Sequence, residues 1–429
     1  MERYFLKCLG CGKTYKDNYF RLRCDEKHEP ALLRTYYRKG SIQIRNDLPG
    51  MYRYYDFLPV NRILDIEGGP VVYKSEALGN YLGLKNLYII FNGYWPEKGA
   101  FLKTGSFKEL EAPSVLGRLP ENNGKTIVVA SAGNTGRAFA NICSENNIPL
   151  ILVIPEKSKN EIWSTKPFND CVKLVLASGN SDYYDAIELS NRIVELDGFF
   201  PEGGTLNVAR RDGMSTTVLA AAFSMGRLPD HYFQAIGSGA GGIAAWEGFL
   251  RLRESGQFDG EKMRLHLSQN YPFIPMVEAW RKGKRFVNIQ DEAQAKADID
   301  VIKAKVLSNR KPPYGVIGGV FDVLNDSGGN MYSVTNREID EATKLFEEKE
   351  GVDIHPAAGV ALGSLIQAVK EKAVKSEDFV ALNITGGGLK LVERDFKRYY
   401  LETYFSFSPE DIYSEKIHVL IEEILSAVS

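Results

Sequence analysis

Glycine and hydroxyl residues gather in three short segments, each directly after a run of β-branched and apolar residues. The segments are Ser131–Gly136 (SAGNTG), Gly237–Gly242 (GSGAGG) and Thr385–Gly388 (TGGG). Ligands of open α/β sheets bind beyond the carboxyl ends of the strands. Glycines there let backbone N–H groups approach an anion, and a following helix adds the positive end of its dipole. The three segments therefore predict one crevice that binds an anionic ligand.

A lysine, Lys108, stands immediately before the predicted helix Glu109–Leu116. It is the last residue of the polar turn Lys103–Lys108 (KTGSFK). A lysine becomes a nucleophile toward a carbonyl group once burial or neighbouring cations remove its proton. A lone lysine is far more often a solvated surface charge, so its spacing alone assigns no role to it.

The elements that must position these segments alternate as in a parallel sheet wrapped by helices. One helix is marked at both ends, because Thr335 and Glu338 form a capping box and Gly351 stands at its stop. The chain after Tyr400 is predicted as a helical tail. The predicted strands are Thr126–Ala130, Leu150–Ile154, Lys173–Leu176, Tyr232–Ile236, Arg264–Ser268 and Phe379–Ile384.

Composition limits the classes of function. With 429 residues, 44% hydrophobic and 25% charged, the chain has enough apolar material for two or three cores. Its 53 Lys and Arg against 55 Asp and Glu provide no broad basic field for nucleic acid or an anionic membrane. The longest apolar runs fall far short of the roughly 18 residues that span a bilayer. The beginning Met-Glu-Arg-Tyr has no apolar signal region, so we expect a cytoplasmic protein that acts on small molecules.

The middle loop admits a rival interpretation. Gly237, Gly239 and Gly242 also satisfy G-x-G-x-x-G, which is typical of a nicotinamide-dinucleotide site in a Rossmann protein. That fingerprint requires an acidic residue at the end of the next strand, about 20 residues on, to hold the ribose. The next predicted strand ends in Ser268-Gln269 instead. A non-catalytic binding module on the same fold is a further alternative.

Four motifs in one order carry a resemblance to a known family. T-G-S-F-K, S-A-G-N-T-G, the glycine-rich loop and T-G-G-G-L-K resemble the fold-type II pyridoxal-phosphate enzymes, and within them threonine synthase, over roughly 69–390. The resemblance implies an α/β, tryptophan synthase β-like fold with two parallel-rich open domains, the cofactor between them, and a small N-terminal ribbon. The implied divisions are 1–45 for the ribbon, 46–115 with 225–400 for the larger domain, 116–224 for the smaller domain, and 401–429 for the tail.

The resemblance also implies roles for single residues. Lys108 would bind pyridoxal 5'-phosphate covalently through its amine, Asn134 would hydrogen-bond the ring hydroxyl, and Thr385 would meet the pyridine nitrogen. A hydroxyl at that nitrogen favours elimination and replacement over transamination. The cofactor phosphate would lie on Gly237, Ser238, Gly239, Ala240, Gly241 and Gly242. The amino-acid substrate would lie on Thr104, Ser106, Ser131, Ala132, Gly133 and Thr135.

Departures from the threonine synthase pattern cluster at the mouth of this site. Lys103 replaces a proline, and Asn207–Gly213 (NVARRDG) resembles N-P-x-R-x-E-G without its proline. An added cation suits a second anionic reactant, so Lys103, Arg210 and Arg211 are candidates for holding phosphate or sulfite. Among relatives of threonine synthase the sequence looks most like the cysteate synthases of methanogens. They replace the phosphate of O-phospho-L-serine by sulfite on the route to coenzyme M, and relatives are commonly homo-oligomers. Threonine synthesis from O-phospho-L-homoserine and cysteine synthesis remain alternatives.

Three of the five cysteines lie near the N-terminus. Cys8 and Cys11 form C-x-x-C, and Cys24 is followed by His28. Two thiolates on a turn with a second pair nearby resemble a zinc knuckle, so a structural zinc ion is one interpretation. The alternatives are a ribbon that has lost its metal or free reduced thiols. The other two cysteines, Cys143 and Cys171, are predicted to be small buried apolar residues.

Overall fold

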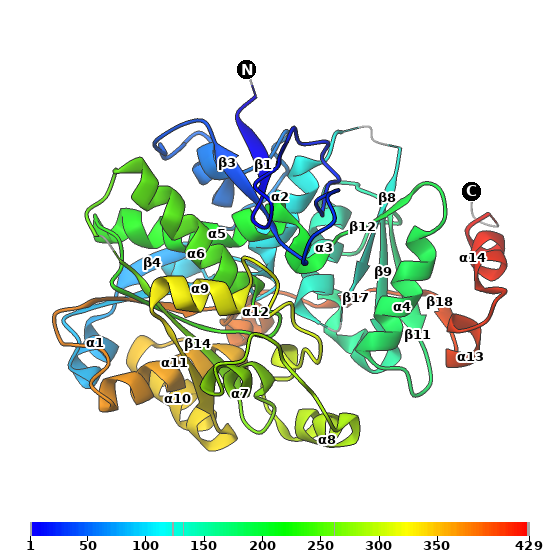
Figure 1. Ribbon diagram of the computed structural model, residues 1–429. Coiled ribbons are helices and arrows are strands. Elements are labelled where there is room, and N and C mark those ends of the chain that lie inside the picture. The colour runs from blue at the N-terminus through cyan, green and yellow to red at the C-terminus, as the bar shows by residue number, and fades with distance from the viewer. Residues whose placement is uncertain (1, 122–123, 132, 261, 427–429) are drawn as a thin grey trace.

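Two α/β layers and an N-terminal ribbon make up the computed structural model (Figure 1), which describes residues 2–121, 124–131, 133–260 and 262–426. No helix within these ranges is long and apolar enough to cross a membrane.

The larger sheet has the strand order β15-β14-β13-β16-β5-β4. It is parallel except for its edge strand β4, which pairs antiparallel with β5. The buried strands β13 and β16 are continuous apolar runs, as expected when helices cover both faces. One apolar core contains side chains of α11 and α10, and another those of α5, α6, α7 and α9. The strands are β4 (Val71–Lys74), β5 (Asn86–Phe91), β13 (His231–Ala235), β14 (Arg264–Asn270), β15 (Asn330–Val334) and β16 (Phe379–Ile384). The helices are α1 (Glu76–Leu82), α5 (Val208–Met225), α6 (Ala240–Ser255), α7 (Pro275–Arg281), α8 (Glu292–Val301), α9 (Val320–Ser327), α10 (Asn336–Glu350), α11 (Pro356–Lys370) and α12 (Leu389–Asp395).

The smaller sheet has the order β12-β8-β9-β11-β18 and is parallel throughout. Helices α2 and α3 pack on one face, while α4, α13 and α14 share an apolar cluster on the other. The strands are β8 (Thr126–Ala130), β9 (Leu150–Pro155), β11 (Val172–Ala177), β12 (Phe199–Pro201) and β18 (Thr403–Phe407). The helices are α2 (Lys108–Arg118), α3 (Asn134–Glu145), α4 (Tyr183–Val194), α13 (Pro409–Ile412) and α14 (Ile417–Ser426).

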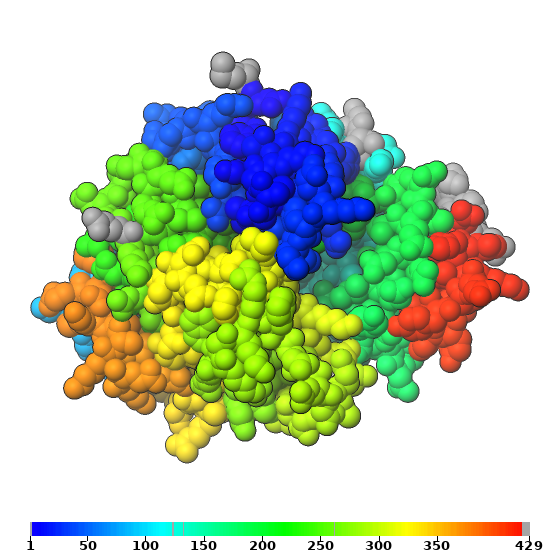
Figure 2. All heavy atoms as spheres, viewed as in Figure 1, coloured from blue at the N-terminus to red at the C-terminus, as the bar shows by residue number. Residues whose placement is uncertain are grey.

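The N-terminal ribbon is a three-stranded antiparallel sheet of β1 (Tyr4–Cys8), β2 (Thr14–Tyr15) and β3 (Leu33–Tyr37). Figure 2 shows it in blue on top of the molecule, where it covers neighbouring segments of both layers. A buried ion pair anchors it: Arg118 at the end of α2 donates from Nη2 to Asp17 Oδ1 at 2.6 Å and from Nε to Asp17 Oδ2 at 2.8 Å. The ribbon therefore touches the helix that Lys108 opens.

All six predicted strands are present, with bounds that differ by no more than two residues. The predicted capping box of Thr335 and Glu338 and the left-handed stop at Gly351 are confirmed. Cys143 is fully buried, whereas Cys171 is only partly buried.

Two predicted divisions differ from the structure. The segment 401–429, predicted as a helical tail, begins with β18, which hydrogen-bonds to β11 and completes the smaller sheet. Helix α5, assigned to the smaller domain 116–224, packs mainly on α6 and α2. The reason is that α5 is apolar or small on almost every side, and the position between these helices buries nearly all of it.

Candidate active site

The loops that follow β13 and β16 converge on the turn that leads into α2. The backbone N–H of Phe107 donates to the Thr385 carbonyl oxygen at 3.0 Å, and that of Gly387 donates to the Gly105 carbonyl oxygen at 3.1 Å. On the other side of the turn, a Cβ added to Gly241 would lie 3.2 Å from the Phe107 ring. The structure thus brings the lysine turn, the TGGG loop and the GSGAGG loop together.

The loop that follows β8 reaches the same region through Asn134 and Thr135, at the first turn of α3. The Ser131 hydroxyl accepts hydrogen bonds from the N–H groups of Gly133 at 3.2 Å and Gly136 at 2.9 Å. This side chain therefore shapes the loop, which leaves backbone groups to meet a ligand. Ala132 lies outside the described residues.

Lys108 is the first residue of α2, and its side chain is 18% exposed. Burial lowers the pKa of its ammonium group, Glu111 raises it, and Arg210 lowers it again, so that it stays below the ordinary value. Nζ donates to Glu111 Oε2 at 3.0 Å. The site therefore favours the free amine that a carbonyl group requires.

Glu111 was not predicted, although it lies three residues after Lys108 and thus on the same helix face. Its carboxylate is completely buried and has three partners. Besides Lys108, it accepts from Thr135 Oγ1 at 2.9 Å and from Arg210 Nη2 at 3.1 Å. Arg210 also donates from Nε to Glu202 Oε1 at 2.8 Å. These contacts form a buried cluster of two cations and two carboxylates.

Asn134 is oriented by Arg137, one helical turn further along α3. Arg137 Nη2 donates to Asn134 Oδ1 at 2.6 Å. Because a guanidinium only donates, the amide must present oxygen to Arg137 and keep its N–H groups for the opposite side. Arg137 is 2% exposed and its guanidinium lies 4.6 Å from the centre of the Trp163 ring. Burial lowers the pKa of Arg137 to about 10.

His355 lies beside the TGGG loop and carries no motif that sequence reasoning could have found. Its backbone N–H donates to the Gly386 carbonyl oxygen at 2.9 Å. Burial, and then the charge of Arg137, lower the pKa of the imidazole to about 4. His355 is therefore neutral near pH 7.

The glycines of the GSGAGG loop are required by close packing. A Cβ on Gly241 would lie 2.0 Å from Gln234 Nε2, and one on Gly239 would lie 2.2 Å from a Val320 methyl. Gly239 has φ of 87°, which also favours glycine. Helix α6 begins at Ala240, so the free N–H groups of its first turn and the loop form an anion site. A phosphate group fits this end, and an aldehyde within reach of Lys108 would fit the other.

Two predicted substrate residues of the lysine turn have structural partners. The Thr104 hydroxyl and N–H both donate to Glu109 Oε2 at 2.6 Å, and the Ser106 hydroxyl accepts from the Lys108 N–H at 3.3 Å. Lys103 pairs with Glu67 at 2.8 Å, and its side chain is 19% exposed.

Arg211 is not brought to this site. It is fully buried on another side of α5, where Nε donates to Glu247 Oε2 at 3.1 Å. Its two Nη atoms donate to the carbonyl oxygens of Thr205 and Leu33. Consecutive helical residues point about 100° apart, so Arg210 and Arg211 cannot face one ligand. The prediction that Arg211 holds a substrate anion is therefore wrong, and the residue connects the ribbon to α6.

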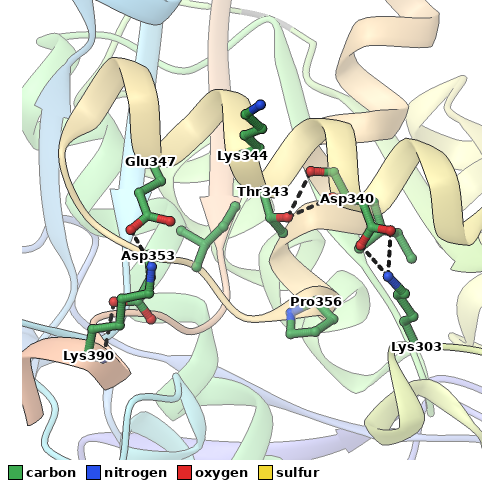
Figure 3. Close-up of a pocket in the computed structure, with 10 residues that line it drawn as sticks. Lys303, Asp340, Thr343, Lys344, Glu347, Asp353, Pro356 and Lys390 are labelled. Carbon is green, nitrogen blue, oxygen red and sulfur yellow. Dashed lines mark hydrogen bonds and ion pairs between the residues drawn. The ribbon is translucent and has the colours of Figure 1, made fainter. Parts of the chain in front are cut away.

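A surface hollow of about 350 Å³ lies apart from Lys108, beside α10 and the start of α11 (Figure 3). Its charged side chains satisfy one another: Lys303 pairs with Asp340, and Lys390 pairs with Glu347 at 2.5 Å. We assign no ligand to it.

The class of protein follows from fold and sequence together. Residues 93–386 match the family described as pyridoxal-phosphate dependent enzyme, to which the chain belongs. The fold is also that of maize serine racemase, with a TM-score of 0.57 at 18% identity over 74% of this chain and 89% of the other. For *Thermus thermophilus* threonine deaminase the TM-score is 0.53 at 16% identity over 74% and 91%. The predicted fold class is thereby confirmed, and the dinucleotide interpretation of Gly237–Gly242 is excluded.

More specific relatives are curated cysteate synthases of methanogens. The chain is 47% identical to cysteate synthase of Methanosarcina acetivorans over 418 residues, which cover 97% of this chain and 100% of the relative. It is 50% identical to cysteate synthase of Methanocella paludicola over 398 residues, 92% of each chain. Within the family, this chain therefore belongs with the cysteate synthases.

Proposed function

We propose that this enzyme replaces the phosphate of O-phospho-L-serine by sulfite, giving L-cysteate and inorganic phosphate. The observation that carries the proposal is the similarity to cysteate synthases at 45–50% identity over nearly the whole chain. Buried cationic and glycine-rich groups around Lys108 support it, because both the leaving group and the incoming nucleophile are anions.

Bound pyridoxal phosphate supplies an electron sink that stabilises negative charge at the α-carbon of an amino acid. Lys108 would hold the cofactor through Nζ, the loop Gly237–Gly242 its phosphate, Asn134 its ring hydroxyl, and Thr385 its ring nitrogen. The free amine of Lys108 then takes the α-proton of the substrate. The Cβ–O bond to phosphate breaks, and a Cβ–S bond to sulfite forms as the proton returns to the α-carbon. Backbone N–H groups of Ser131, Gly133 and Thr135 would orient the substrate carboxylate.

The incoming anion needs a cation that is not already committed. Arg210 is held by two buried carboxylates, whereas Lys103 pairs with Glu67, whose side chain is 57% exposed. Exposed ion pairs contribute only about 0–1 kcal/mol, so an anionic reactant can displace Glu67 from Lys103. Lys103 is therefore the better candidate for sulfite.

Lys103→Ala is expected to raise the sulfite concentration for half-maximal rate on the order of tenfold, equivalent to about 1.4 kcal/mol. Glu67→Gln should lower it, because it frees the same ammonium group. Initial rates at saturating O-phospho-L-serine measure both. A sulfite requirement that is the same in both variants and the wild type would remove Lys103 from the site.

Threonine synthesis is the second candidate, since the motifs resemble that group as well. Offering the enzyme O-phospho-L-serine or O-phospho-L-homoserine, each with sulfite, sulfide or water, separates the candidates. We expect cysteate from the first substrate with sulfite as the dominant product. Homo-oligomer formation stays a prediction, which the molecular mass in solution tests.

We also infer that the ribbon binds one structural zinc ion. One ligand atom from each of Cys8, Cys11, Cys24 and His28 lies within 4.8 Å of all the others. Cys11 and Cys24 have their sulfur atoms 3.6 Å apart, and Cys8 Sγ lies 3.3 Å from His28 Nε2. A tetrahedral zinc with Zn–S near 2.3 Å separates its ligands by roughly 3.5–3.8 Å. His28 Nδ1 lies 2.5 Å from the Glu29 carbonyl oxygen, which leaves Nε2 for metal.

The purified protein should accordingly contain about one zinc per chain by elemental analysis. Cys24→Ser should lose most of that metal and lower the unfolding temperature, because metal binding contributes directly to folding. Cys171→Ser is the matched control, since Cys171 lies in the smaller domain, away from the cluster. Metal-free wild-type protein whose stability does not change on adding zinc would contradict the inference.

A further inference from the structure

The buried cluster around Lys108 contains groups that the reaction above does not use. Glu111 is 0% exposed, Glu202 6% and Arg210 7%. Glu111 alone among the carboxylates of the described residues contacts Lys108 Nζ, at 3.0 Å. Glu202 contacts Arg210 at 2.8 Å and approaches Lys108 only through space. Tyr183 is the other titratable group that faces Arg210.

The charges of the cluster restrict where a proton from Lys108 can go. With Lys108 as an ammonium ion, two cations and two carboxylates sum to zero. Were the proton lost to water, one buried carboxylate would remain without a compensating cation, which costs several kcal/mol. Transfer to Glu111 leaves the sum at zero, because a neutral amine and a neutral carboxyl remain beside the Arg210–Glu202 pair.

We propose that Glu111 is a catalytic acid–base residue that exchanges a proton with Lys108. In the forward step the Nζ–H bond breaks, its electron pair stays on Nζ, and the proton forms an O–H bond at Glu111 Oε2. In the reverse step the proton returns to Nζ, and Lys108 again becomes an ammonium ion. Thr135 and Arg210 hold the carboxylate in place through Oε1. The proposal rests on Lys108 carrying the cofactor and does not depend on which anion is the nucleophile.

Glu111→Gln removes the proton acceptor and nearly preserves the side-chain shape. Its expected effect is on the pH dependence with which pyridoxal phosphate becomes attached to Lys108 in cofactor-depleted full-length protein. Borohydride reduction followed by mass analysis of the Lys108 peptide measures this attachment without turnover. Because the variant lacks the negative charge beside Nζ, the midpoint should move to lower pH by about one unit or more, a tenfold change in free amine. The turnover number with O-phospho-L-serine and sulfite should fall on the order of a hundredfold, because the proton cannot be returned.

Glu202→Gln is the matched control, since it also removes a carboxylate from Arg210 but none from Lys108. We expect a clearly smaller shift in the midpoint. Glu111→Asp, which keeps an acid at this position, should retain a midpoint nearer to that of the wild type. Equal shifts for Glu111→Gln and Glu202→Gln, or reduced thermal stability with an unchanged midpoint, would overturn the proposal. If no amino-acid product forms in any variant while the Glu111→Gln midpoint still moves, the proposed overall reaction is wrong and the role of Glu111 stands.

Discussion

Lys108→Ala is expected to abolish both turnover and covalent retention of pyridoxal phosphate. Lys108 is the lysine at the point where the lysine turn meets the TGGG and GSGAGG loops, and its pKa is lowered by burial. Loss of a group that acts as both nucleophile and base should reduce the rate by at least about 10⁴-fold. Added cofactor should still bind through the phosphate loop, so the variant should lack only the component that borohydride fixes to the chain.

Lys390→Ala is the control for this variant. Lys390 belongs to the T-G-G-G-L-K motif, but its ammonium group pairs with Glu347 and its side chain is 65% exposed. It should keep the colour of the bound cofactor and most of the activity. If Lys108→Ala retains cofactor that borohydride fixes to another lysine, the assignment of Lys108 is wrong.

Arg211→Met should act on stability and leave the sulfite requirement unchanged. The Arg211 side chain is fully buried and that of Glu247 is 1% exposed, so the substitution leaves a buried carboxylate with weaker partners. Removing one member of a buried ion pair typically costs about 3–5 kcal/mol. The free energy of unfolding, from urea titration, should fall by about that amount.

Arg227→Met is the comparison for Arg211→Met. Arg227 pairs with Asp230, and both side chains are about one-third exposed, at 32% and 33%. Such a pair contributes about 0–1 kcal/mol, so its loss should have little effect. A stability loss for Arg211→Met no larger than that for Arg227→Met would show that the buried cluster does not hold the ribbon in place.

The sequence allowed the strands and the loops after them to be predicted because both signals are local. Apolar runs that end in glycine mark the carboxyl ends of parallel strands, and those ends must meet at one edge. β18 was missed because its residues 403–407 alternate like an edge strand and lie far in sequence from β11, their partner. Pairing over that separation has no local signature.

Within the site, the residues that touch backbone or cofactor positions were predictable, and those that act through other side chains were not. Arg210 and Arg211 were predicted together from composition, but helix geometry separates them into two clusters. Glu111 and Arg137 each lie three residues from a predicted site residue on one helix, and that spacing is the signal that could have found them. His355 depends on tertiary contact with the TGGG loop alone.

The most direct test of the proposed reaction uses the holoenzyme, O-phospho-L-serine and sulfite labelled with a heavy sulfur isotope. We expect one labelled L-cysteate for each phosphate released, with both products absent when Lys108→Ala replaces the wild type. Phosphate release without label in the amino acid, or conversion of O-phospho-L-homoserine to threonine in place of this reaction, would contradict the account.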